Sequence, residues 1–160
     1  MKNDYRKTGY EKIDHNVSQT TLKFTRSGSA EFYTPTTSDE TMLVQIPPHA
    51  QDDLFVHRYQ TDQLLVVRGS FVLVTLRDRQ YQYIPLSDRT PTLLTISRGV
   101  LHGAINFSDE PCMVVNAVIR HGKPCDRDYR PVKPPIPYDL NAARQALASL
   151  DRPTVHVMSA

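Results

Sequence analysis

The chain contains an evenly spaced series of short segments rich in β-forming residues, each followed by a turn signal. Polar and apolar residues alternate within several segments, as they do in half-buried strands. Strands are expected at residues 21–25, 30–33, 42–46, 54–59, 81–86, 92–96, 102–107 and 112–119, and residues 63–76 are expected to form two strands hinged at 68–70. About nine or ten short strands at this spacing predict an all-β sandwich or barrel.

Two positions refine this pattern. Gly69 lies at the hinge, where glycine can take a positive φ without steric cost. Pro85 falls inside the segment 81–86. Because proline has no N–H to donate to a neighbouring strand, this segment is expected at a sheet edge or to end there.

The two ends of the chain differ from its middle. Residues 1–19 are polar without clear periodicity and predict an N-terminal arm, whereas residues 20–123 predict the β-domain. Residues 124–160 begin with five prolines spread over fourteen positions and predict an extended tail. Within this tail a short C-terminal helix is expected at 139–150, with Asp139 as its N-cap.

Composition limits the classes of partner. The formal charge of +2 is small, and arginines alternate with aspartates in the region 68–98, so no nucleic-acid partner is expected. No apolar segment is long enough to span a membrane, and the N-terminus lacks the apolar core of a signal peptide. Two cysteines do not make a disulfide framework. We therefore expect a cytoplasmic protein without a membrane partner.

Residues 97–106, which read SRGVLHGAIN, place a histidine just past a glycine turn and at the start of a β-rich segment. Such a position points the imidazole ring of His102 in a defined direction. A second histidine, His57, also lies in a β-rich segment. The two histidines are therefore expected on opposite walls of the β-domain, facing each other.

These residues resemble two motifs of the cupin superfamily. Gly99, His102 and Asn106 have the spacing of its second motif, with a serine where proline is usual. His57 and Gly69 match the ends of its first motif, in which Tyr59 replaces the second histidine and Asp62 or Gln63 replaces the glutamate. The resemblance covers about residues 40–120 and implies a jelly-roll β-barrel.

Within the cupins, the sequence is similar to the dTDP-4-dehydrorhamnose 3,5-epimerase group, through HRYQTDQLLVVRGSFVLVTLRD, YIPLS and ISRGVLHGAINFSDEP. This similarity implies that His57 matches the catalytic base and His102 the second histidine of the barrel. Asp62 stands where that group has a lysine, and no tyrosine lies near the last strand at the position of its general acid. Tyr129 lies further along the chain. The related sugar 3,4-ketoisomerases use a pair of histidines, and Tyr59 replaces the second of them.

The candidate residues follow from these motifs. His57 has the pKa range suited to removing a proton next to a carbonyl when a carboxylate orients its ring. The catalytic candidates are His57, His102, Tyr59 and Asp62, and the ligand-binding candidates are Arg68, Gln63, Tyr81, Tyr83 and Asn106. Tyrosines can stack on a sugar or a base, and arginine can bind a phosphate through two hydrogen bonds.

Three functions remain open at this point. The first is a cupin that binds a small sugar-derived ligand, such as a nucleotide sugar, and epimerises or isomerises it through His57. The second is a binding or regulatory cupin without catalysis, and the third is a metal-dependent oxygenase. Two histidines without a third strong ligand bind metal poorly, so no cofactor is expected, and a metal at His57 and His102 is the less favoured alternative. The resemblance also implies a homodimer that exchanges N-terminal strands.

Overall fold

The computed structural model describes residues 11–14, 17–33 and 35–151, and this part of the chain is built mainly from β-strands. The strands are β1 (Glu11–Asp14), β2 (Val17–Thr21), β3 (Phe24–Ser27), β4 (Ala30–Tyr33), β5 (Glu40–Ile46), β6 (Gln60–Arg68), β7 (Ser70–Arg77), β8 (Gln80–Ser87), β9 (Thr92–Ile96), β10 (Leu101–Ile105) and β11 (Cys112–Arg120). The helices are η1 (Asp126–Tyr129), α1 (Leu140–Ala148) and η2 (Ser149–Asp151). The predicted all-β class is confirmed.

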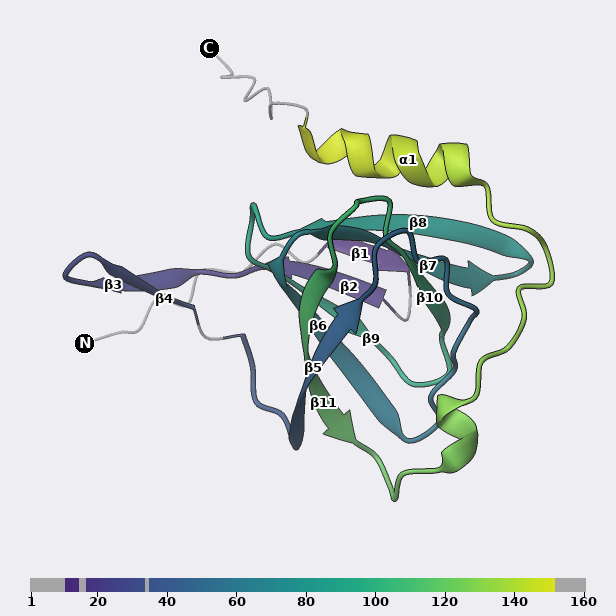
Figure 1. Cartoon of the computed structure of the whole chain (residues 1–160). Coiled ribbons are helices and arrows are strands. Elements are labelled where there is room, and N and C mark those ends of the chain that lie inside the picture. The colour runs from purple at the N-terminus through teal and green to yellow at the C-terminus, as the bar shows by residue number, and fades with distance from the viewer. Residues whose placement is uncertain (1–10, 15–16, 34, 152–160) are drawn as a thin grey trace, which may run out of the picture.

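The strands form two main sheets and a separate two-stranded hairpin (Figure 1). The larger sheet has the order β1-β2-β9-β6-β11-β5 and the smaller has the order β10-β7-β8. Among the described residues, β3 pairs only with β4. Val66 and Leu94 of the larger sheet share one apolar core with Phe71 and Ile84 of the smaller sheet. The two sheets therefore pack face to face. No strand pairing among the described residues closes them into a ring, so the predicted barrel is not confirmed.

The two positions singled out in the sequence occupy the predicted places. Gly69 joins β6 to β7 with φ +88°, a value that glycine adopts without strain. Strand β8, which contains Pro85, is an edge strand of the smaller sheet. Between β7 and β8, Asp78 and Arg79 both have positive φ, as the two central residues of a type I′ hairpin turn require.

Strand β2 lies partly inside the region that the sequence assigned to an arm. It pairs antiparallel with β9 along its whole length and is therefore part of the larger sheet. The prediction of one strand at 21–25 is wrong, because residues 22 and 23 are not in a strand and separate β2 from β3. The polar side chains of β2 do not predict a buried strand, although its backbone pairs with a neighbouring strand on both sides.

The strand predicted at 54–59 is also wrong. Leu54 and Phe55 make only isolated bridges, to Val132 and His102 respectively, and β6 begins at Gln60. The last two residues of this segment use other partners: the backbone N–H groups of residues 58 and 59 donate to a side-chain carboxylate instead of a neighbouring strand. His57 consequently lies in a loop that leads into β6.

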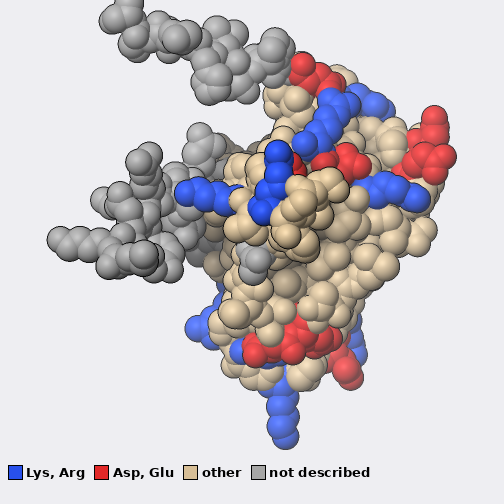
Figure 2. All heavy atoms as spheres, turned by 90° about the vertical axis from the view of Figure 1, so that its left-hand side faces the viewer, with Lys and Arg blue, Asp and Glu red and all other residues tan. Residues whose placement is uncertain are grey.

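Helix α1 covers the outer face of the smaller sheet (Figure 1). Asp139 caps it as predicted, because its carboxylate accepts the N–H of Ala142 at 2.9 Å. Val72, Val74 and Ile105 form a second apolar cluster with the helix. None of the helices in the described part of the chain is long and apolar enough to cross a membrane. On the side shown in Figure 2, Lys and Arg side chains lie near Asp and Glu side chains instead of forming one basic surface.

Candidate functional site

A cavity of about 300 Å³ lies between the two sheets and has one polar end. The side chain of Asp62 enters it from β6, that of His102 enters it from β10, and His57 reaches it from the loop before β6. The strand alternation of β6 places Gln60, Asp62 and Leu64 on the inner face. Three of the four predicted catalytic residues therefore meet at this end of the cavity.

Asp62 lies between the two histidines. Its Oδ2 is 3.4 Å from Nε2 of His57 and 3.5 Å from Nε2 of His102. Its Oδ1 accepts hydrogen bonds from the side-chain amides of Gln60 at 2.6 Å and Asn116 at 2.9 Å. The residue is only 3% exposed. A buried carboxylate is tolerated when donors surround it in this way.

The environment shifts two pKa values in this cluster. Burial alone would raise the pKa of Asp62, but the adjacent His102 ring, the Asn116 amide and His57 together bring it below its usual value. Burial lowers the pKa of His57, and although Asp62 opposes this effect, the net shift is downward. The cluster therefore favours a carboxylate at Asp62 beside a neutral ring at His57.

The two histidines differ in how their hydrogens are fixed. Nδ1 of His102 lies 2.9 Å from the carbonyl oxygen of Val100, and a carbonyl only accepts, so Nδ1 carries the hydrogen. Nε2 of His102 then bears a hydrogen toward Asp62 only when the ring is cationic. Nδ1 of His57 is buried without a hydrogen-bond partner among the described residues. The neutral His102 ring is therefore held in one tautomer, whereas no hydrogen bond to Nδ1 among the described residues fixes the tautomer of His57.

The same three residues could hold a metal ion. His57, Asp62 and His102 each offer one ligand atom, and these atoms lie within 4.8 Å of one another. Two histidines and one carboxylate form a known set for divalent iron. The sequence offers Tyr59, Asp62 or Gln63 as weak third ligands beside the two histidines, and the structure brings Asp62 to them. The same three groups can also face one another without a metal, when protons lie between the Asp62 carboxylate and the histidine rings.

His57 is held in place by a residue that the sequence analysis missed. The carboxylate of Asp128, in η1, accepts the backbone N–H groups of Arg58 at 2.9 Å and Tyr59 at 3.2 Å. The carbonyl oxygen of His57 accepts the N–H of Gly99 at 2.7 Å. The loop is thus anchored on both sides of the histidine. No local sequence pattern predicts this role for Asp128, which lies about seventy residues after Arg58, in the proline-rich tail.

Tyr129 is a second residue that the sequence analysis did not assign to the site. It lines the cavity, and its ring centroid is 5.7 Å from that of His57. Its hydroxyl donates to Gln60 Oε1 at 3.0 Å and accepts from the guanidinium of Arg120 at 2.9 Å. Arg120 also donates to Gln60 and pairs with Glu40. A continuous set of hydrogen bonds therefore leads from the surface to Asp62.

Several predicted site residues lie outside the cavity. Tyr59 is 42% exposed and lies beside Gly122, and Arg68 is exposed at the end of β6. Gln63 is buried but points away from the cavity, where its amide donates to the carbonyl oxygens of Thr37 and Ala117. The structure therefore separates the fourth catalytic candidate, Tyr59, from the other three.

The remaining three ligand-binding candidates have structural partners. Asn106 donates its amide to three backbone carbonyls and accepts from Ser108, so it fixes the turn after β10. Tyr81 and Tyr83 are predicted to bind the ligand, and neither of them lines the cavity. They lie on the outer face of the smaller sheet, where they contact Tyr138 and the start of α1.

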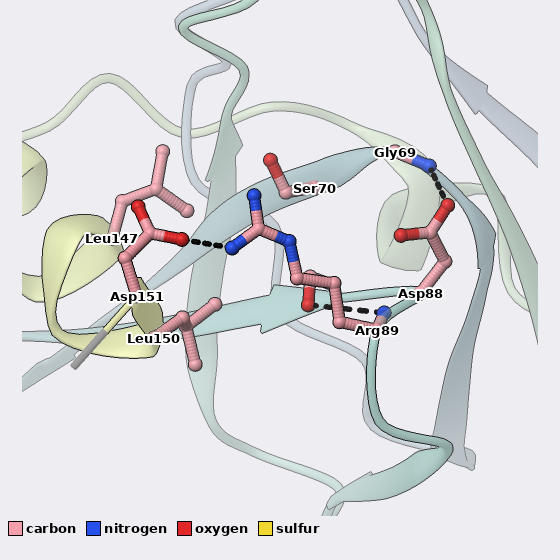
Figure 3. A pocket seen from close by; sticks show the side chains of 8 residues that line it. Gly69, Ser70, Asp88, Arg89, Leu147, Leu150 and Asp151 are labelled. Atoms are coloured by element: carbon pink, nitrogen blue, oxygen red, sulfur yellow. Dashed lines mark hydrogen bonds and ion pairs between the residues drawn. The ribbon is translucent and has the colours of Figure 1, made fainter. Parts of the chain in front are cut away.

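A second hollow lies between the start of β7 and the end of the helical segment (Figure 3). Its polar groups are paired with one another: Arg89 forms an ion pair with Asp151, and Asp88 accepts the backbone N–H of Gly69. This hollow joins the C-terminal end of the helix to the sheet. It presents no cluster comparable to that around Asp62 in the described part of the chain.

Comparison with known structures identifies the fold. A 4-keto-6-deoxy sugar epimerase from the novobiocin gene cluster of Streptomyces spheroides has a TM-score of 0.60 at 15% identity, over 88% of this chain and 92% of its own. A TDP-quinovose 3,4-ketoisomerase from Campylobacter jejuni has a TM-score of 0.62 at 13% identity, over 74% and 95%. A dTDP-4-dehydrorhamnose 3,5-epimerase from Sulfolobus tokodaii has a TM-score of 0.59 at 13% identity, over 73% and 77%.

No family model matches the sequence, and no curated protein matches it significantly. The chain therefore has the cupin-like fold of these sugar epimerases and ketoisomerases, as the sequence motifs indicated. At identities this low, the likeness establishes the fold and leaves the activity open.

Proposed function

We propose that this protein binds a small sugar-derived carbonyl compound in the cavity between the sheets and that His57 removes a proton from the carbon next to the carbonyl. One observation carries this proposal: a buried carboxylate lies between two histidine rings at the polar end of a cavity. The shared fold supports the reaction class, because the structural neighbours are named as epimerases and ketoisomerases.

The chemistry follows from the protonation of the cluster. A neutral His57 ring can accept a proton, and the imidazolium that forms lies 3.4 Å from the carboxylate of Asp62, which stabilises it. The electron pair left on carbon moves into the carbonyl and forms an enolate oxygen. His102 supplies the hydrogen bond to that oxygen when its ring is cationic, because only then does its Nε2 bear a hydrogen. Delivery of a proton from solvent to the opposite face of the same carbon, while His57 releases its proton to solvent, gives epimerisation. When that carbon bears a hydroxyl, loss of the hydroxyl proton and transfer of the proton from His57 to the former carbonyl carbon give isomerisation.

A binding protein without catalysis is the second candidate, and Asp62 favours it. A carboxylate beside the position of an enolate oxygen opposes the second negative charge that catalysis requires. In the epimerase group that the sequence resembles, this position is a lysine. Ligand binding without proton transfer is therefore the outcome expected if the charge of Asp62 is not neutralised by His102.

Solvent deuterium exchange separates these candidates. The protein is incubated in deuterium oxide with a nucleotide-linked 4-keto-6-deoxy sugar, and proton NMR follows the hydrogens next to the carbonyl. General-base catalysis typically contributes a factor of about 10² to 10⁴, so His57→Gln should slow exchange by that amount. His49→Asn is the matched control, because His49 is exposed and has a positive φ that asparagine tolerates. Ligand binding without exchange in the wild-type protein would establish the binding role instead.

We also propose that the protein forms a homodimer through the outer face of the larger sheet. Leu43, Val115 and Leu65 form one apolar row across β5, β11 and β6, and Leu43 is 66% exposed. The β3–β4 hairpin pairs with no other strand, and a lone two-stranded hairpin is marginally stable in water. A second copy would cover both features. Light scattering should report a dimer that Leu43→Lys converts to monomer, and a monomeric wild-type protein would contradict this proposal.

A further inference from the structure

The cavity has a second end that differs from the one around Asp62. Apart from the polar cluster and Asp52, apolar side chains from both sheets form its wall. These are Ile46, Leu64, Phe71, Leu73, Ala104 and Val114. They come from five strands of the two sheets, so apolar side chains line the space from both sheets instead of from one.

The side-chain amides at the border between the two ends already have partners. Asn116 donates to Asp62 and accepts the backbone N–H of Gln63. Gln60 donates to Asp62 and accepts from Arg120 and from the hydroxyl of Tyr129. Each amide is therefore bonded at both its nitrogen and its oxygen atom. A ligand hydroxyl that lies against the apolar side chains named above meets methyl, methylene and aromatic groups.

This arrangement selects against polyhydroxylated ligands. A hydroxyl that leaves water for an apolar wall gives up its hydrogen bonds and gains none, which weakens binding on the order of tenfold for each such group. An alkyl or aryl group in the same place gains from the burial of its surface. A cavity of about 300 Å³ is at the lower end of the range for ligand sites, so it encloses a single ring.

We infer that the ligand of this cavity is a carbonyl-bearing ring whose body is apolar, with its carbonyl at His57 and its apolar side against Phe71 and Leu73. The placement of the carbonyl rests on the proposed function, whereas the apolar body rests on the wall itself. A sugar ring that has lost hydroxyls and an alicyclic ketone share this chemistry. Both differ from an unmodified hexose.

The test uses two rings that differ only in their substituents. A methyl-substituted cyclohexanone and the fully hydroxylated cyclohexanone are titrated into the full-length protein, and two-dimensional NMR follows the shifts of cavity residues. The methyl ketone should bind at least tenfold more tightly. Equal or tighter binding of the hydroxylated ring would overturn the inference, and so would the failure of both rings to bind. A nucleotide-linked deoxy sugar that competes with the methyl ketone would identify a sugar as the source, whereas no competition would identify a non-sugar ketone.

A matched pair of variants tests whether the apolar side chains of the cavity cause the preference for the methyl ketone. Val114→Thr places a hydroxyl in the cavity at nearly constant volume, and it should narrow the preference for the methyl ketone several-fold. Val118→Thr makes the same change on the same strand at a buried residue outside the cavity, and it should leave the preference unchanged. Equal effects of the two variants would contradict the inference.

The two proposals fail in different ways. Binding of the methyl ketone without deuterium exchange at its α-carbon would overturn catalysis and support the assignment of an apolar ligand. Exchange with a clear preference for the hydroxylated ring would support catalysis and overturn the apolar ligand.

Discussion

The two faces of the smaller sheet are built from the same three strands but are covered in opposite ways. On the outer face, Val72, Val74 and Ile105 are fully buried against helix α1 and Ala143. On the inner face, Leu73 borders an open cavity. A packed face stabilises the fold, whereas a face that leaves space gives up dispersion contacts to accommodate a ligand. Stability and ligand binding are therefore assigned to opposite sides of one sheet.

The largest expected difference between the faces concerns the loss of a large side chain. Ile105→Ala on the outer face should lower the free energy of unfolding by about 3–5 kcal/mol, because the tightly packed helix cannot collapse into the space. Leu73→Ala should cost about 2–3 kcal/mol, since its side chain already borders unfilled space. Urea unfolding measures both. Equal losses of unfolding free energy in the two variants would show that the cavity wall is packed as tightly as the helix interface.

A second comparison adds volume instead of removing it. Ala143→Leu on the outer face should destabilise the protein by about 1–3 kcal/mol, because the alanine is fully buried against the sheet. Ala104→Leu extends into the cavity and should change stability by less than about 1 kcal/mol while abolishing ligand binding. Thermal unfolding and ligand titration report the two effects. If Ala104→Leu still bound ligand, the occupied space would lie elsewhere.

The polar end of the inner face should make stability depend on pH. The pKa of His57 is lowered in the folded protein, so between that pKa and the unfolded value of about 6.5 only the unfolded chain binds the proton. Stability should therefore fall as the pH drops below about 6.5, by at most about 1.4 kcal/mol per pH unit for one proton. Asp62, whose pKa is also lowered, adds a loss of the same sign below about pH 4.

His57→Gln checks the pH prediction. Unfolding free energies measured between about pH 5 and 7 should slope upward with pH in the wild-type protein and be flatter in the variant, because glutamine does not titrate. The outer face, where the described cluster consists of apolar and tyrosine side chains, should contribute no slope in this range. An unchanged slope in His57→Gln would assign the effect to another histidine.

The contrast between the faces also explains what the sequence could and could not predict. Period-2 alternation located most strands, and the spacing around His102 identified the fold. Alternation does not say which face is inside, and for this reason it could not show that Tyr81 and Tyr83, which are ligand-binding candidates, lie on the face that packs against the helix. Asp128 and Tyr129 follow the last strand by several residues and reach His57 only through the folded chain. Contacts of that range leave no local pattern in a single sequence.

The smallest expected effect concerns the attachment of the helix to the outer face. Asp139→Ala removes the N-cap hydrogen bond to Ala142 and should lower stability by about 1 kcal/mol, whereas Asp139→Ser keeps a capping oxygen and should recover most of that loss. Ligand affinity should stay unchanged in both variants, because the helix lies on the opposite side of the sheet from the cavity. Calorimetry measures the first quantity and titration the second. If Asp139→Ala lost ligand affinity and Asp139→Ser recovered it, the packing of the helix on the outer face would determine the shape of the cavity on the inner face. The sheet would then transmit strain between its two sides.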